Sequence, residues 1–158
     1  MNTEKKGHPA GLYLVFFTGM WERFSYYAMR GILVLYLTAT WLNGGLGYDE
    51  KFSTTVYGLA TGLCYFTPLF GGWLSDRYLG QRKSILIGGF IMVLAQFLLF
   101  APELFTTVSP NLTPEQLAHN EFIGRVGLFA GLFLLIIGNG FFKPNISSIV
   151  GDLYEPGD

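Results

Sequence analysis

Three charged residues and two tyrosines interrupt the first long apolar segment of the chain. The stretch WERFSYYAMR (21–30) places Glu22, Arg23 and Arg30 between the apolar runs LYLVFF and GILVLYL. A charge at the centre of a bilayer costs about 2.5–3.5 kcal/mol on insertion scales, so these side chains are expected to face protein or water. A carboxylate can hold a proton, and guanidinium groups bind anionic groups of a ligand. The stretch therefore predicts a polar surface inside an apolar helix.

Helical geometry puts part of this stretch on one face. At about 100° per residue, Arg23, Tyr27 and Arg30 fall along one stripe, and Glu22 and Tyr26 lie beside it. Two arginines against one glutamate leave positive charge over, which favours an anionic ligand group. The alternative is that Glu22 and Arg23 only pair with neighbouring helices and hold them together.

Lys143 adds another cation within a later apolar segment. It lies in the stretch GNGFFKPN (138–145), where Pro144 removes a backbone hydrogen bond and permits a kink. Lys143 is about eight residues from the expected membrane exit, or roughly 12 Å at the rise of an α-helix. That is a long reach for a side chain that only extends to the interface. We therefore expect its ammonium group to face an internal cavity.

The composition indicates that these residues belong to membrane-spanning helices. Of the 158 residues, 51% are hydrophobic and 13% are charged, with a mean hydropathy of +0.39. A soluble domain carries about 25% charged residues. The net charge of −1 gives no support for a nucleic-acid partner. Four segments reach the length of about 20 residues that spans the hydrocarbon: about 11–41, 54–75, 84–104 and 124–150.

The basic residues that flank these segments predict the orientation, because they gather on the cytoplasmic side. Five of them fall on one side: Lys5, Lys6, Arg77, Arg82 and Lys83. We expect a multi-pass protein of the plasma or bacterial inner membrane with a cytoplasmic N-terminus. Residues 1–10 would form a cytoplasmic tail, and 11–158 a partial transmembrane bundle.

Glycine pairs at a spacing of four predict where helices approach closely. Gly58 and Gly62 form one such pair, and Gly127 and Gly131 form another. Small residues at this spacing let two helix backbones come into contact. We expect both pairs to be packing faces.

The segment between the second and third expected helices carries a recognisable pattern. Residues 71–83 read GGWLSDRYLGQRK, and the pattern G-x-L-S-D-R-x-x-G-x-R-K resembles the loop signature of the major facilitator superfamily. The resemblance implies a gating loop, in which the aspartate helps to latch the two halves of a transporter. The alternative is a plain basic loop, which leaves the glycines and the aspartate unexplained. The matching positions are Gly72, Asp76, Arg77, Gly80 and Arg82.

Three motifs in order resemble the proton-coupled oligopeptide transporter family: WERFSYY followed by an arginine, CYFTPLFGGWLSDRYLG, and GNGFFKPN. One extra residue before Gly80, compared with the general superfamily loop, is also a mark of that family. The resemblance runs from about Gly11 to the last residue. It implies an all-α membrane protein whose four transmembrane helices correspond to the first part of the N-terminal six-helix bundle of such a transporter.

The resemblance also implies roles for individual residues. It places Glu22, Arg23 and Lys143 in proton coupling. It implies a peptide-binding cavity lined by five residues: Arg23, Tyr27, Arg30, Tyr65 and Lys143. Protons would be the coupling ion, and neither a metal nor another cofactor is expected.

The expected function is proton-coupled symport of di- and tripeptides by alternating access. The partners would be the peptide, protons, the lipid bilayer and the C-terminal half of the same transporter, so this N-terminal fragment is not expected to transport alone. A transporter of nitrate or another small anion is one alternative, and a membrane scaffold with structural ion pairs is another. An intramembrane enzyme is disfavoured, because the spans contain no second catalytic carboxylate, metal cluster or nucleophile–base pair.

The sequence departs from the family pattern E-x-x-E-R-F-x-Y-Y-G at two positions. Gly19 replaces the first glutamate, and Ala28 replaces the glycine. Proton coupling would therefore depend on Glu22 alone, or be weaker.

Overall fold

The computed structural model describes residues 10–106, 109 and 111–153, and these residues form helices without strands. The helices are α1 (Ala10–Thr38), the short 3₁₀ helix η1 (Trp41–Asn43), α2 (Glu50–Leu74), the π-helix η2 (Ser75–Leu79), α3 (Gln81–Phe105) and α4 (Pro114–Asp152). Most of the expected N-terminal tail, including Lys5 and Lys6, lies outside the described residues.

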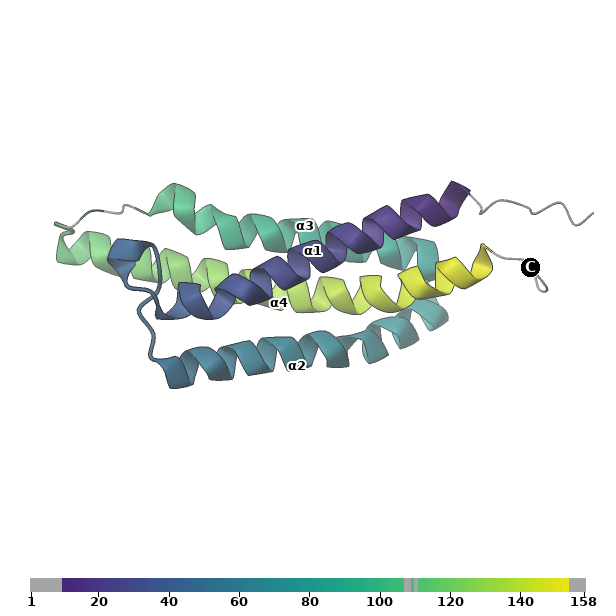
Figure 1. Ribbon diagram of the computed structural model, residues 1–158, viewed down its shortest axis with the longest axis horizontal. Coiled ribbons are helices and arrows are strands. Elements are labelled where there is room, and N and C mark those ends of the chain that lie inside the picture. The colour runs from purple at the N-terminus through teal and green to yellow at the C-terminus, as the bar shows by residue number, and fades with distance from the viewer. Residues whose placement is uncertain (1–9, 107–108, 110, 154–158) are drawn as a thin grey trace, which may run out of the picture.

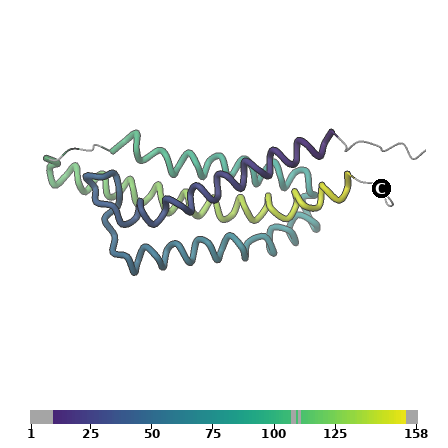
Figure 2. The backbone as a smooth tube through the Cα atoms, viewed as in Figure 1, coloured from purple at the N-terminus to yellow at the C-terminus, as the bar shows by residue number. Residues whose placement is uncertain are grey.

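Helix α4 is the centre of the bundle. It packs along α3 on one side and along α2 on the other, whereas α1 crosses the bundle obliquely and touches its neighbours less (Figure 1). The four long helices alternate in direction, so the start of α1, the turn between α2 and α3 and the end of α4 lie at the same end (Figure 2). This arrangement lets side chains from α1, α2 and α4 meet near the middle of the bundle.

Glycines allow α4 to lie against its neighbours without intervening side chains. A Cβ added at Gly71 of α2 would collide with the backbone carbonyl of Gly140. A Cβ at Gly138 would lie 2.9 Å from the carbonyl oxygen of Gly88 on α3. These contacts hold the middle of α4 between two helix backbones.

The two predicted glycine pairs differ in outcome. Gly131 packs against Leu99, and Gly127 packs against Leu98 and Pro102, all in α3, as a helix-packing face should. By contrast, a Cβ at Gly58 or Gly62 would meet nothing within 4 Å in the described structure. The expectation of a packing face at Gly58 and Gly62 is wrong for the described residues, because this pair lies on a face of α2 that no described helix covers.

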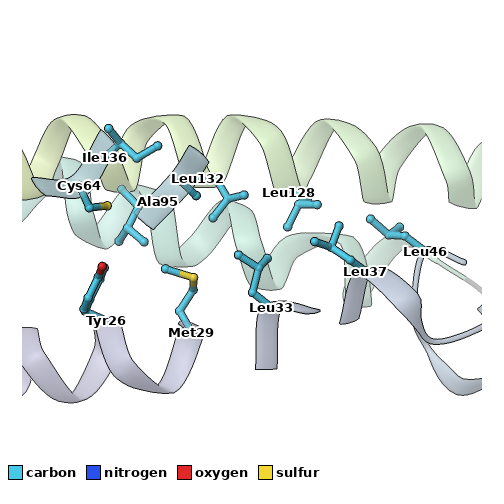
Figure 3. Packing of buried hydrophobic residues seen from close by; sticks show 12 residues of the cluster. Tyr26, Met29, Leu33, Leu37, Leu46, Cys64, Ala95, Leu128, Leu132 and Ile136 are labelled. Carbon is cyan, nitrogen blue, oxygen red and sulfur yellow. The ribbon is translucent and has the colours of Figure 1, made fainter. Parts of the chain in front are cut away.

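Helix α1 contacts the bundle through one face. Tyr26, Met29, Leu33 and Leu37 recur every three or four residues, and all are buried. Figure 3 shows these side chains pointing toward residues of the other three helices, among them Cys64, Ala95 and Leu128. The spacing gives one apolar face of a helix, which continues to Glu22 one turn before Tyr26 and leaves Arg23 and Tyr27 on the neighbouring face.

The helix bounds differ most from those expected at the starts of α4 and α2. Helix α4 begins at Pro114, well before residue 124, because Thr113 and Gln116 form a capping box and proline suits the first helical position. Helix α2 begins at Glu50, where the Asp49 carboxylate accepts a hydrogen bond from the backbone N–H of Phe52. Each start lies in polar sequence, so hydropathy alone placed it too late.

The end of α1 also differs, since it comes at Thr38 and not near 41. Gly44 and Gly47 have φ values of 75° and 65°, which turn the chain back on itself. The backbone N–H of Leu46 then donates to the carbonyl of Tyr36 on the last turns of α1.

The contact between α2 and α4 yields a stability prediction. We expect Gly71→Ala to lower the free energy of unfolding by about 1–3 kcal/mol, because overpacking against a backbone carbonyl cannot be relieved by a side-chain movement. The measurement is thermal unfolding of the purified protein in detergent. Gly62→Ala on the same helix is the matched control and should not lower the melting temperature. Equal melting temperatures for the two variants would contradict this packing.

Candidate functional site

The Glu22 carboxylate lies against the middle of α4. Its Oε1 accepts a hydrogen bond from Asn139 Nδ2 at 3.2 Å, and Glu22 is half-buried. Lys143 follows Asn139 by one helical turn, so both residues face α1. The charges of Lys143 and Arg23 act on this carboxylate, although no ion pair within 4.0 Å joins Glu22 to another described residue.

The Lys143 ammonium lies between aromatic rings of two helices. Its Nζ is 4.8 Å from the ring centre of Tyr65 on α2 and 5.8 Å from that of Tyr26 on α1. Ring faces attract cations and do not neutralise them. Lys143 is half-buried between α1 and α2, and these ring contacts leave its charge available for an anion.

Arg30, one helical turn after Tyr26 on α1, also lies near the Tyr26 ring. Its Nε and Nη2 both donate to the hydroxyl of Tyr57, at 3.0 and 2.5 Å. Its guanidinium carbon lies 5.6 Å from the ring centre of Tyr26. Tyr26 is thus a buried aromatic residue with two cations near its ring.

The predicted site residues are only partly brought together. Lys143 and Arg30 lie near the ring of Tyr26, Lys143 also contacts Tyr65, and Glu22 bonds Asn139 one helical turn before Lys143. Tyr27 packs its ring against that of Tyr26, with centres 5.5 Å apart, but is 57% exposed. Arg23 is exposed, and no hydrogen bond or ion pair joins it to another described residue.

Three residues at the site were not predicted as site residues: Tyr26, Tyr57 and Asn139. Tyr57 precedes Tyr65 by eight positions, which is close to two helical turns, so a tyrosine face on α2 could have been found from the spacing. Asn139 precedes Lys143 by four positions and was recognisable as a polar residue on the lysine's face. Which of these residues faces Glu22 depends on how the helices pack, and that is not visible in the sequence.

The loop motif is built around a wide turn. The residues of η2 form a π-helix, closed by the Gly80 N–H donating to the Ser75 carbonyl at 2.8 Å. A π turn contains one residue more than an α turn, which accounts physically for the extra residue before Gly80. Gly80 has a φ of 77°, a value that favours glycine, and α3 begins directly after it.

This loop contacts α4 next to Lys143. A Cβ at Gly72 would lie 3.4 Å from Pro144. The buried Ser75 hydroxyl donates to Asn145 Oδ1 at 2.6 Å. The charged residues of the motif, Asp76, Arg77 and Arg82, are exposed, and Arg77 stacks on Trp73 and Tyr78.

A cavity of about 700 Å³ lies between α1 and α3, bordered by Leu128 and Phe142 of α4, and Lys143 is not among its lining residues. Glu22, Ser25 and Gln96 line it together with mostly apolar side chains, and Gln96 Nε2 donates to Ser25 Oγ. In the described part of the chain, no three His, Cys, Asp or Glu side chains gather as a metal site would require.

Two of the described helices, α3 and α4, are long and apolar enough to cross a membrane by length and composition. The number of crossings expected from the sequence, four, therefore stays a prediction. Helix α1 carries Glu22, Arg23 and Arg30, which lower its apolar character.

Charged side chains that converge between long apolar helices are typical of helical membrane transporters, where they mark the substrate or ion pathway. Residues 82–158 match the family model described as the POT family. Relatives and solved structures of similar proteins align over nearly the whole chain, as detailed below. The chain is therefore similar to POT family transporters over nearly its whole length, as the three sequence motifs indicated.

The similar proteins include transporters of known and unknown substrate. The di-/tripeptide transporter of Lactococcus lactis is 39% identical over 160 residues, which cover 99% of this chain and 28% of that protein. The uncharacterized transporter YclF of Bacillus subtilis is 36% identical over 96% of this chain and 27% of its own length. A crystal structure of a peptide transporter POT in complex with sulfate superposes with a TM-score of 0.81 at 38% identity, over 98% of this chain and 27% of that one. The chain thus spans about a quarter of the length of these relatives.

Proposed function

We propose that this chain forms the first four transmembrane helices of a transporter that imports di- and tripeptides together with protons. The observation that carries the proposal is that the Lys143 ammonium lies against Tyr26 of α1 and Tyr65 of α2, one helical turn from Asn139, which bonds Glu22. A carboxylate, a nearby ammonium and a tyrosine-lined surface supply a proton site next to an anion site.

The anion site would bind the peptide carboxylate. Arg23, Arg30 and Lys143 outnumber the single acid Glu22, so positive charge is left for a ligand. Tyr27 and Tyr65 are 57% and 58% exposed, which leaves this side of the bundle accessible. The similarity to a di-/tripeptide transporter, and to a peptide transporter solved with a bound anion, supports the assignment.

Proton coupling would follow from competition for Lys143. Ionised Glu22 attracts the ammonium, and so do the carboxylates of incoming peptides. Protonating Glu22 removes its charge, which leaves Lys143 and Arg23 free for the substrate. Since Gly19 stands where the family has its first glutamate, Glu22 would carry this step by itself.

The proposed topology has four crossings and a cytoplasmic N-terminus. The π turn and its basic residues would then lie in the cytoplasm, where Asp76, Arg77 and Arg82 could latch the loop to the rest of the transporter. The remaining helices and the opposite half would come from further chain, in keeping with the length of the relatives. These residues alone are expected not to transport.

A chimera tests the function directly. These 158 residues replace the aligned segment of the Lactococcus lactis di-/tripeptide transporter, and the purified chimera is placed in vesicles. We expect labelled dialanine to accumulate when protons are driven inward and to accumulate much less without that gradient. Equal accumulation with and without the gradient would refute the proposed proton coupling. Uptake of nitrate without uptake of peptide would show that the substrate is a small anion and not a peptide. The unmodified relative is the control for vesicle quality.

A further inference from the structure

Asn139 has a buried side-chain amide whose NH2 group makes a hydrogen bond and whose oxygen does not. Its exposure is 1%. Its Nδ2 donates to Glu22 Oε1, whereas its Oδ1 is buried and has no hydrogen-bond partner in the described structure. A buried acceptor without a donor is costly, so an unpaired amide oxygen beside a titratable carboxyl group calls for an explanation.

The backbone around Asn139 is held in place by its neighbours. Gly138 lies so close to α3 that a Cβ there would be 2.9 Å from the Gly88 carbonyl oxygen. Gly140 lies so close to α2 that a Cβ there would be 2.9 Å from the Cβ of Thr67. Helix α4 is therefore wedged between α2 and α3 at this point, and the side-chain torsions of Asn139 are its remaining freedom.

The amide matches both protonation states of a carboxyl group. Ionised Glu22 can only accept hydrogen bonds, and it accepts one from Nδ2. Protonated Glu22 carries an O–H that must find an acceptor, and the unpaired Oδ1 supplies one after a half-turn of the amide. The same side chain thus offers a partner before and after a proton arrives, without any movement of the helices.

We propose that Asn139 is a positioning residue for proton coupling, which holds Glu22 at the lysine and exchanges its donor for its acceptor when Glu22 takes up a proton. The inference rests on the proposed function. It adds a residue that touches neither peptide nor bulk water but sets the pH range over which Glu22 acts.

Among the groups that face Glu22, Asn139 is the one suited to accept a hydrogen bond from its protonated form. Lys143 of α4 and Arg23 of α1 stabilise the ionised form, and the neutral thiol of Cys64 faces it from α2. From α3, the uncharged Gln96 lines the same cavity as Glu22. The two cations have no acceptor and a thiol is a weak one. Gln96 donates to Ser25 and makes no hydrogen bond to Glu22 in the described structure, whereas the Asn139 amide already bonds the Glu22 carboxylate.

The test is the pH profile of dialanine uptake by the chimera with Asn139→Leu, which keeps the branched shape of the side chain and removes its hydrogen-bond donor and acceptor. Asn145→Leu is the matched control: the same substitution in a buried residue of the same helix, whose amide bonds Ser75 and the Phe141 carbonyl instead of a carboxylate. We expect Asn139→Leu to reduce gradient-driven accumulation by roughly tenfold, the effect of losing a hydrogen bond to a charged group. We expect it to reduce peptide counterflow in the absence of a gradient much less, and to change the pH of half-maximal uptake. Asn145→Leu should lower both activities together and leave that pH unchanged.

Asn139→Asp gives a second, independent readout. Two carboxyl groups that share a site hold one proton more tightly, so the pH of half-maximal uptake should rise by about one unit or more. An unchanged pH in both Asn139 variants, in a chimera whose gradient-driven uptake is intact, would overturn the role of Asn139 and leave the proposed function standing. Loss of gradient dependence already in the unsubstituted chimera would instead refute the proposed function.

Discussion

Lys143→Ala is expected to reduce peptide uptake by the chimera to near background. The substitution removes the cation that lies between the rings of Tyr26 and Tyr65. It also leaves Glu22 with one neighbouring cation fewer. Truncating one partner of a buried charged contact costs about 2–5 kcal/mol, which corresponds to roughly thirty-fold to several thousand-fold in binding. The measurement is initial uptake of labelled dialanine together with the affinity of the purified chimera for the peptide.

Two variants make this prediction specific. Lys51→Ala removes an exposed lysine from the first turn of α2 and should leave uptake unchanged. Lys143→Arg keeps the charge but changes the shape of the cation, so it should restore peptide binding in part. If Lys143→Ala and Lys51→Ala gave the same uptake, Lys143 would have no part in substrate binding.

Glu22→Gln is expected to separate transport from the proton gradient. Glutamine has the same shape and can still accept the hydrogen bond from Asn139, but it cannot take up a proton. Gradient-driven accumulation should disappear, whereas counterflow of one peptide against another should continue, since Lys143 remains free to bind a carboxylate. The measurement compares both modes of uptake across the same range of pH.

Glu121→Gln provides the control for Glu22→Gln. Glu121 forms an exposed ion pair with Arg125 near the start of α4, far from the site along that helix. Exposed pairs of this kind contribute about 0.3–0.5 kcal/mol, so neither mode of uptake should change. Accumulation that still follows the gradient in Glu22→Gln would show that another group carries the proton.

The sequence was informative about the site wherever a residue type conflicted with its surroundings. Charges in apolar segments identified Glu22, Arg30 and Lys143. Arg30 and Lys143 lie near the ring of Tyr26, and the charge of Lys143 acts on Glu22. The similarity to the POT family followed from motif order. Hydropathy also located the apolar middle of each long helix, because the hydropathy of a segment depends only on its amino-acid composition.

Features that depend on packing between helices could not be derived in this way. The orientation of Tyr26 into the bundle, with Tyr27 outside, follows from how α1 leans on α2 and α4, which the periodicity of one helix does not define. The exposed face at Gly58 and Gly62 shows the same limit: the pattern of small residues matches a packing face, but no described helix lies there. Hydropathy places the starts of α2 and α4 too late for another reason: their capping residues, Asp49 and Thr113, lie in polar sequence.

The pairing of Glu22 with Asn139 has a consequence for how the protein is made. The two residues are 117 positions apart, so at about 5–20 residues per second the ribosome finishes α4 roughly 6–23 s after it has synthesised α1. During that interval α1 exposes an acid and two arginines without the amide and the lysine that later face them, and inserting each into lipid would cost about 2.5–3.5 kcal/mol. On the proposed topology, the first helix must be retained by the insertion machinery until the fourth arrives. Nascent chains truncated before residue 139 should therefore crosslink through α1 to that machinery, whereas longer ones should be released to the bilayer.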